Sequence, residues 1–239
     1  MKRTRLGLVA VLSAVTMALF ASPVAAQTTT TDGLITSLNL DLLYLAIPIV
    51  VVTEVVLFYA VWRFRKSDEP KPTQENRRLE ITWTIATAII LLFVGVASYG
   101  VLAQPDVAHA EQDPIAPDDD DVVVEASAYQ WGWDMSYPEE DVEAEDSRIV
   151  VPADTDIYFL VETQDVIHGF HVPEMGLKVD AIPGMTNTVQ THTLEEGTYQ
   201  GYCSEFCGTA HSQMYFTVEV VSEEDYEQHI DDLREEQSE

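Results

Sequence analysis

The chain is poor in cysteine and in positive charge. Only two of its 239 residues are cysteines, and 12 Lys and Arg face 41 Asp and Glu, which gives a formal net charge of −29. With so few cysteines, a domain of this size has to be stabilised by its hydrophobic core rather than by disulfides. Such an acidic surface repels nucleic acid and anionic lipid. We therefore expect no nucleic-acid partner.

The negative charge is concentrated in the second half of the chain. From residue 104 onward there are 34 Asp and Glu and three basic residues, Arg148, Lys178 and Arg234. Such a surface suits cationic partners, or a very salty medium in which exposed charges are screened within a few ångströms. Because the acidity runs through the whole region, we predict a halophilic source, specifically a halophilic archaeon. An acidic docking face in an ordinary organism is the alternative.

Three apolar runs precede this acidic region. Residues 1–26 combine basic residues at the start, an apolar run and small residues at the end, which predicts a cleaved signal peptide. Residues 27–103 hold two runs, at about 42–62 and 82–103, each close to the length that crosses a bilayer. The connector between them is basic, which predicts a cytoplasmic loop and both chain ends outside the cell membrane. Its basic residues are Arg63, Arg65, Lys66, Lys71, Arg77 and Arg78.

The remainder has a β-rich pattern. Residues 104–121 hold Pro, Ala and four successive aspartates without apolar periodicity, which is typical of a linker. Short β-rich runs follow within residues 122–221 and predict an all-β sandwich. These runs are 122–129, 148–152, 156–162, 186–194, 198–203 and 214–221. In the tail, residues 222–239, Ser222 three positions before Asp225 predicts the N-cap of a polar helix.

Both cysteines lie within one short segment, GYCSEFCGTAHSQMYF, residues 201–216. Cys203, Cys207, His211 and Met214 have the spacing C-x3-C-x3-H-x2-M. A disulfide is the usual fate of two cysteines outside the cell, but a bridge over four residues would close a very small loop. Two thiols, an imidazole and a thioether form a soft donor set that favours copper over Mg²⁺ or Ca²⁺ and fits zinc less well.

A further ligand has to come from elsewhere in the fold. The segment DVIHGFHVPEMG, residues 165–176, carries two histidines on what we expect to be a loop. Either His168 or His171 could supply the imidazole.

These segments together resemble a known family. DVIHGFHVP, LKVDAIPG and YCSEFCGTAHSQM, with LEITWT and YQWGW, are similar to subunit II of haem-copper cytochrome c oxidases, which carries the dinuclear copper A centre. The resemblance implies a two-helix transmembrane hairpin followed by a cupredoxin-like β-sandwich. It covers nearly the whole chain after residue 26.

The resemblance also assigns roles to individual residues. Cys203 and Cys207 would bridge two copper ions, His168 and His211 would each bind one of them, and Met214 and the Glu205 carbonyl would be weak ligands. It places the point where electrons enter at Trp131 and the mouth of a proton path at Glu80. It further implies that the Glu205 carboxylate helps to hold Mg²⁺ against the catalytic subunit.

The implied function is electron transfer within an oxidase that another subunit completes. A soluble donor, cytochrome c or a small blue-copper protein, would reduce the copper pair, and haem in subunit I would receive the electron, with oxygen reduced to water and protons translocated. The alternatives are the same copper domain serving nitric oxide or nitrous oxide reduction, a copper-storage domain, and a secreted β-sandwich with a small disulfide. The hairpin with LEITWT favours the oxidase.

Overall fold

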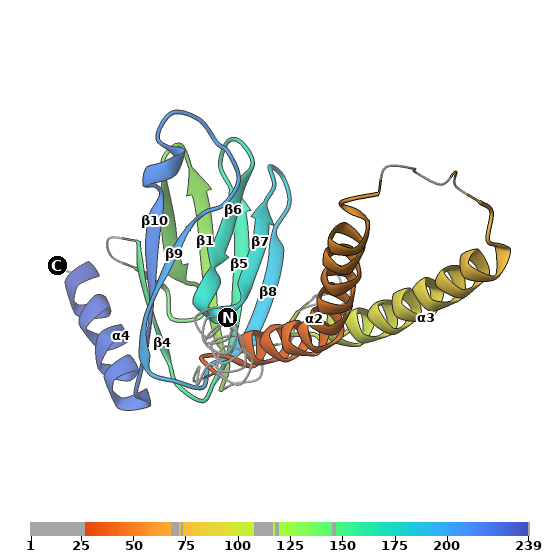
Figure 1. The fold of residues 1–239 in the computed structure, drawn as a ribbon. Helices are drawn as coiled ribbons and strands as arrows, with labels where there is room; N and C mark the ends of the chain where they lie inside the picture. The colour runs from red at the N-terminus through yellow and green to blue at the C-terminus, as the bar shows by residue number, and fades with distance from the viewer. Residues whose placement is uncertain are drawn as a thin grey trace, which may run out of the picture.

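The computed structural model describes residues 27–67, 72, 74–107, 117, 120–144 and 147–238. The predicted signal peptide, residues 1–26, lies outside the described residues, as does much of the predicted linker. In these residues two helices are followed by strands that form two five-stranded sheets and then by a C-terminal helix (Figure 1).

The two N-terminal helices are long, apolar and exposed. Helix α2 covers Thr30–Phe64 and α3 covers Arg77–Leu102. The most apolar 18-residue stretch of each helix has a mean hydropathy of 2.3 and is not buried within the chain. Both are therefore long and apolar enough to cross a membrane. Pro48 lies inside α2, where it removes a backbone donor, and the helix is bent (Figure 1).

The β-sandwich consists of two sheets whose strand orders are β3-β2-β1-β5-β8 and β4-β10-β9-β6-β7. The first sheet contains β1 Val122–Tyr129, β2 Gly132–Tyr137, β3 Val142–Glu143, β5 Asp156–Thr163 and β8 Asn187–His192. The second contains β4 Arg148–Pro152, β6 His168–Val172, β7 Leu177–Ala181, β9 Gly197–Cys203 and β10 Tyr215–Val221. The short helices η1 Pro173–Met175 and η2 His211–Gln213 lie in the connections, and α4 Glu223–Gln237 ends the chain.

Alternating burial along the strands builds the core between the sheets. In β9 the odd-numbered residues Tyr199, Gly201 and Cys203 point inward and the others outward, the period of a half-buried strand. At the centre Phe170 stacks on Phe216 and packs at a tilt against Phe159. The Tyr137 hydroxyl joins the two sheets, because it donates to the Val150 carbonyl and accepts from the Val150 N–H.

One segment closes the sandwich at the end where α2 begins, and a second covers its edge at β3 and β4. Thr28 to Thr31 lie against β8 and η1, with Thr29 fully buried and its hydroxyl bonded to the Met175 carbonyl. Helix α4 starts at the predicted cap, where Ser222 accepts from the Asp225 N–H, and buries Tyr226, Ile230 and Leu233 against the core. The β9–β10 connection projects at the opposite end (Figure 1).

The predicted fold class, two apolar helices followed by a β-sandwich, is confirmed. The sequence pattern located six of the ten strands and missed β2, β3, β6 and β7. The expected loop around His168 is wrong, because residues 168–172 form β6 and residues 177–181 form β7. Pairing of β6 with β9 on one side and β7 on the other holds this segment extended in spite of its glycine.

Candidate metal centre

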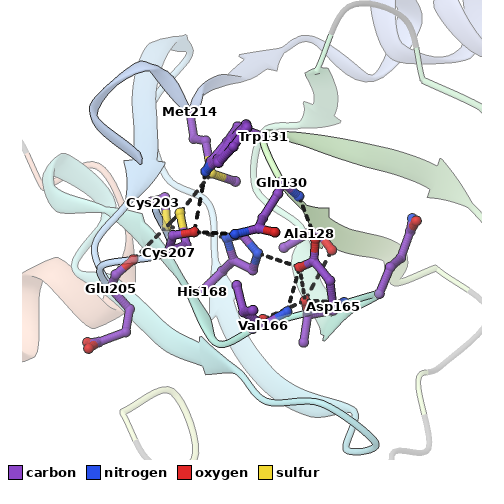
Figure 2. A network of polar contacts seen from close by, with 12 residues as sticks. Ala128, Gln130, Trp131, Asp165, Val166, His168, Cys203, Glu205, Cys207 and Met214 are labelled. Atoms are coloured by element: carbon purple, nitrogen blue, oxygen red, sulfur yellow. Dashed lines mark hydrogen bonds and ion pairs between the residues drawn. The ribbon is translucent and has the colours of Figure 1, made fainter. Parts of the chain in front are cut away.

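The cysteine-rich segment and the strand that starts at His168 meet at the end of the sandwich remote from α4. Cys203 is the last residue of β9, and Met214 directly precedes β10. The Cys203 N–H donates to the Met214 carbonyl, and the Ser204 N–H donates to the Gly169 carbonyl. These backbone bonds fix the loop against β6, so that His168, Cys203, Cys207 and Met214 are all buried (Figure 2).

The donor atoms face one another across a small space. The two Sγ atoms are 3.8 Å apart, His168 Nδ1 is 3.7 Å from Cys203 Sγ, and His211 Nδ1 is 3.6 Å from Cys207 Sγ. Met214 Sδ lies 3.2 Å from Cys207 Sγ, and the Glu205 carbonyl oxygen lies 3.2 Å from Cys203 Sγ. The structure therefore brings together all six predicted metal residues, with Glu205 contributing its backbone.

The cysteines form no disulfide. Their sulfur atoms are 3.8 Å apart, whereas a disulfide bond is about 2.05 Å long. Burial, and next the neighbouring Cys203, raises the pKa of the Cys207 thiol to about 12. A bound metal ion deprotonates its thiol ligands, so a cation beside Cys207 would favour its thiolate form.

A carboxylate fixes the orientation of His168. Its Nε2 lies 2.9 Å from Asp165 Oδ1, so the Nε2–H donates to the carboxylate and the Nδ1 lone pair faces Cys203. Burial opposes ionisation of Asp165, but hydrogen bonds from His168 and from the N–H groups of Val166 and Gln130 hold its pKa below the usual range. Asp165 thus orients the histidine that the resemblance selected.

His168, Cys203, Cys207, His211 and Met214 together form a cluster that we name the cage. The β1–β2 turn contacts the cage on the side of Cys207. Gln130 Nε2 donates to the Cys207 carbonyl at 2.7 Å, and the Trp131 indole N–H donates to the same oxygen at 3.3 Å. The Gln130 backbone N–H donates to Asp165 Oδ2 at 2.8 Å. One residue thereby connects the segment that carries His168 with the segment that carries Cys207 (Figure 2).

Two glycines permit these close approaches. A Cβ on Gly169 would lie 2.4 Å from Ser204 Oγ and 3.1 Å from the Glu205 nitrogen. Gly208 has a φ of +124°, and a Cβ there would lie 3.1 Å from both Gln130 Nε2 and the Trp131 ring. Glycine is therefore required where the loop touches β6 and where it touches the β1–β2 turn.

The other predicted residues lie outside the cage. His171 is three residues further along β6 and points away, with its Nδ1 donating to the Leu177 carbonyl. Trp131 is 42% exposed beside Cys207, and the Glu205 side chain points to solvent. Glu80 lies in the exposed first turn of α3. Sequence reasoning missed Asp165 and Gln130; a carboxylate three residues before His168 was the one available signal.

The donor set fits copper. The ligand atoms of His168, Cys203 and Cys207 all lie within 4.8 Å of one another, and a thioether completes the site. Buried thiolates, neutral imidazoles and a thioether select soft metal ions. Mg²⁺ and Ca²⁺ prefer oxygen donors, of which this cage offers only one carbonyl.

Loss of Asp165 is expected to weaken copper binding. Without the carboxylate the His168 ring is no longer held, and such supporting contacts are worth about 10–100-fold in metal affinity. We predict that loss for Asp165→Ala in a competition titration of the full chain against a copper chelator. Asp134→Ala is the matched control, because Asp134 accepts from Gln164 at the surface. Equal affinity of the two variants would show that Asp165 does not support the site.

By fold and site the chain is a membrane-anchored, copper-type metalloprotein. The family model of the periplasmic domain of cytochrome c oxidase subunit II matches residues 141–221, and the family model of its transmembrane domain matches residues 10–101. A probable cytochrome c oxidase subunit 2 of Rickettsia bellii is 35% identical over 208 aligned positions, covering 78% of this chain and 74% of the relative. The chain belongs to the cytochrome c oxidase subunit II family.

Other relatives are covered to different extents. Cytochrome c oxidase subunit 2 of Arabidopsis thaliana is 34% identical over 228 positions, covering 84% of each chain. The chain spans 64% of the length of the relative from Rickettsia felis. The crystal structure of the periplasmic domain of subunit II from Bradyrhizobium japonicum is 28% identical, with a TM-score of 0.47, and covers 50% of this chain and 97% of that one.

Family membership makes the chain a subunit of an oxidase complex, so its partners include other oxidase subunits. The two apolar helices and the match to the transmembrane domain identify a membrane protein, whose β-sandwich lies outside the membrane.

Proposed function

We propose that the chain receives electrons from a soluble donor outside the cell membrane and delivers them to haem in the catalytic subunit, where oxygen becomes water and protons are translocated. The observation that carries this proposal is the buried cage of Cys203, Cys207, His168, His211 and Met214. This cage supports the binding of two copper ions, because each sulfur faces a different imidazole: Cys203 faces His168, and Cys207 faces His211. The donor is cytochrome c or a small blue-copper protein.

The chain's own residues hold the site rigid. Two copper ions held by Cys203 and Cys207 together with His168 and His211 would spread one electron over both metals, which would keep bond-length changes small. Asp165 fixes the ring of His168, and Gln130 fixes the backbone of Cys207. Ligands that are held in one geometry in both oxidation states lower the cost of reorganisation.

We propose that electrons enter at Trp131. Its ring is partly exposed, and its N–H reaches the carbonyl of Cys207, so a short covalent and hydrogen-bonded route joins the surface to the cage. Trp131→Ala should slow electron transfer from the donor by at least about tenfold, since it removes the exposed aromatic contact. Flash-induced reduction of the assembled oxidase measures this rate. Trp62→Ala, at an exposed tryptophan of α2, is the control.

The copper absorption spectrum separates the possible outcomes of that experiment. An unchanged spectrum with a slow donor reaction supports the role of Trp131. An unchanged donor rate contradicts it.

Four finer assignments belong to the same proposal. The basic connector between α2 and α3 is on the cytoplasmic side of the plasma membrane, which places the first turn of α3, with Glu80, at the mouth of a proton path. The exposed Glu205 carboxylate joins groups of the catalytic subunit in holding Mg²⁺. The acidic β-domain reflects a halophilic source, and the signal peptide ends at Ala26.

A further inference from the structure

The start of α2 is bonded to the edge strand β8 of the first sheet. Helix α2 begins at Thr30, directly after Thr29, whose backbone pairs with Thr193. The hydroxyl oxygens of Thr31 and Thr191 are 2.7 Å apart, and both residues are buried. A buried hydroxyl is costly unless it is hydrogen-bonded, so these contacts hold the start of the helix in one arrangement.

Asp106 connects three separate elements at the same point. It follows the end of α3 at Leu102 by four residues. Its Oδ2 accepts from Thr30 Oγ1 at 2.7 Å, and its Oδ1 accepts from Gln190 Nε2 at 3.3 Å. Its carbonyl accepts from Thr31 Oγ1 at 2.9 Å. One residue therefore bonds the chain that leaves α3 both to the start of α2 and to β8.

The second sheet contacts the same turn of α2 through Gly176. This glycine ends η1 with a φ of +69°, and a Cβ on it would lie 3.0 Å from the Asp32 nitrogen and 3.3 Å from Ile35 Cδ1. Glycine therefore permits the close approach of η1 to the helix. We name the residues that make these contacts the joint; they are Thr29, Thr31, Asp106, Gly176 and Thr191.

The joint determines how the sandwich sits on the two helices. Among the described residues, the main contacts of α2 with the sandwich are to β8 and η1. The most apolar stretches of α2 and α3 are not buried within the chain. Two parts of a chain that share a small interface move relative to each other by default, and the buried hydrogen bonds of the joint oppose that motion.

We propose that Asp106 is a positioning residue for electron transfer, because it holds the sandwich, and with it the cage, in one orientation relative to both membrane helices. The inference rests on the proposed function, in which the cage delivers electrons to a group on another subunit. The cage lies at the other end of the sandwich from the joint, so a small rotation at the joint displaces the cage further (Figure 1). A displacement of about 1 Å between reacting groups can lower a rate by about a hundredfold.

Distance measurements on the full chain test the joint without copper. Spin labels on non-natural side chains at Tyr99 of α3 and Thr198 of β9, both exposed, leave the two cysteines unchanged. Asp106→Ala should broaden the distance distribution from pulsed electron paramagnetic resonance by at least about twofold. Asp106→Asn should keep the wild-type distribution, because its amide retains an acceptor for one side-chain partner and gains a donor for the other. Asp232→Ala, at an exposed carboxylate of α4, is the control.

A pair of glycines provides a steric test of the same joint. Gly176→Ala should shift the mean of that distance distribution, because the new Cβ would meet the first turn of α2. Gly184→Ala is the matched control, since Gly184 has a φ of +77° and a Cβ there would meet nothing within 4 Å. Both variants strain the backbone alike, so a difference between them reports the contact with α2.

Flash-induced reduction of the assembled oxidase tests the consequence for electron transfer. Asp106→Ala should slow the copper-to-haem step by at least about tenfold, with an unchanged copper spectrum and donor-to-copper step, and Asp106→Asn should restore the rate. An unchanged distance distribution in Asp106→Ala would overturn the proposal, and so would a broadened distribution with a wild-type copper-to-haem rate. Failure of the proposed function has another signature, a wild-type chain without a shared-electron copper signal.

Discussion

Cys207→Ser is expected to abolish the dinuclear centre. The Cys207 sulfur faces Cys203, His211 and Met214, so its loss removes a donor that lies beside three others. An alcohol does not ionise at neutral pH, and its oxygen is a hard donor in a soft site. Structural metal sites of four ligands contribute about 10–16 kcal/mol, so the loss of one ligand should reduce copper affinity by about 10²–10³-fold.

Copper titration of the full chain in detergent measures this loss. The variant should bind less than the full complement of copper and should lose any absorption that depends on two bridging thiolates. Thr209→Ala is the matched control, because Thr209 is exposed in the same loop. A Cys207→Ser chain that retained wild-type copper content and spectrum would show that the second thiolate is not a ligand.

Dilute buffer is expected to destabilise the β-domain. The 34 acidic residues after residue 103 repel one another, and only three basic residues offset them. The Debye length is about 30 Å at 0.01 M and about 3 Å at 1 M, so repulsion across the whole domain at low salt becomes repulsion between neighbours at high salt. We expect the melting temperature of the full chain to rise by at least about 10 °C over this range.

Circular dichroism during heating in KCl solutions tests this expectation. An uncharged osmolyte at the same osmolality serves as the control, because it strengthens burial without screening charge. If the chain is equally stable in dilute buffer, the acidic surface does not reflect a halophilic source. It would then be a docking face for a cationic donor.

Local patterns predicted the parts of the fold that depend on local forces. The apolar runs of the two helices and the alternation in β1, β5 and β10 are properties of the strands and helices themselves. Strand β6 was missed because HGFHV is short and punctuated by glycine, and pairing with β7 and β9 makes it extended. The packing of Thr28, Thr29 and Thr31 was missed for a similar reason, since each has a partner more than a hundred residues away.

The candidate site shows the same division. The soft donors of residues 203–214 share one loop, so spacing alone brings them together. The selection of His168 over His171 depended on the resemblance, and the structure supplies its physical basis: His168 points into the core beside Asp165, whereas His171 points outward. Gln130 could not be predicted, because its contact with Cys207 joins residues 77 positions apart.

The central claim is that the cage holds two copper ions sharing one electron. Electron paramagnetic resonance of the full chain, loaded with copper under mild oxidation, tests it most directly. The account predicts a hyperfine pattern in which one unpaired electron couples equally to two copper nuclei, and the loss of that pattern in Cys207→Ser. A pattern from a single copper nucleus in the wild-type chain, or no copper uptake, would contradict it.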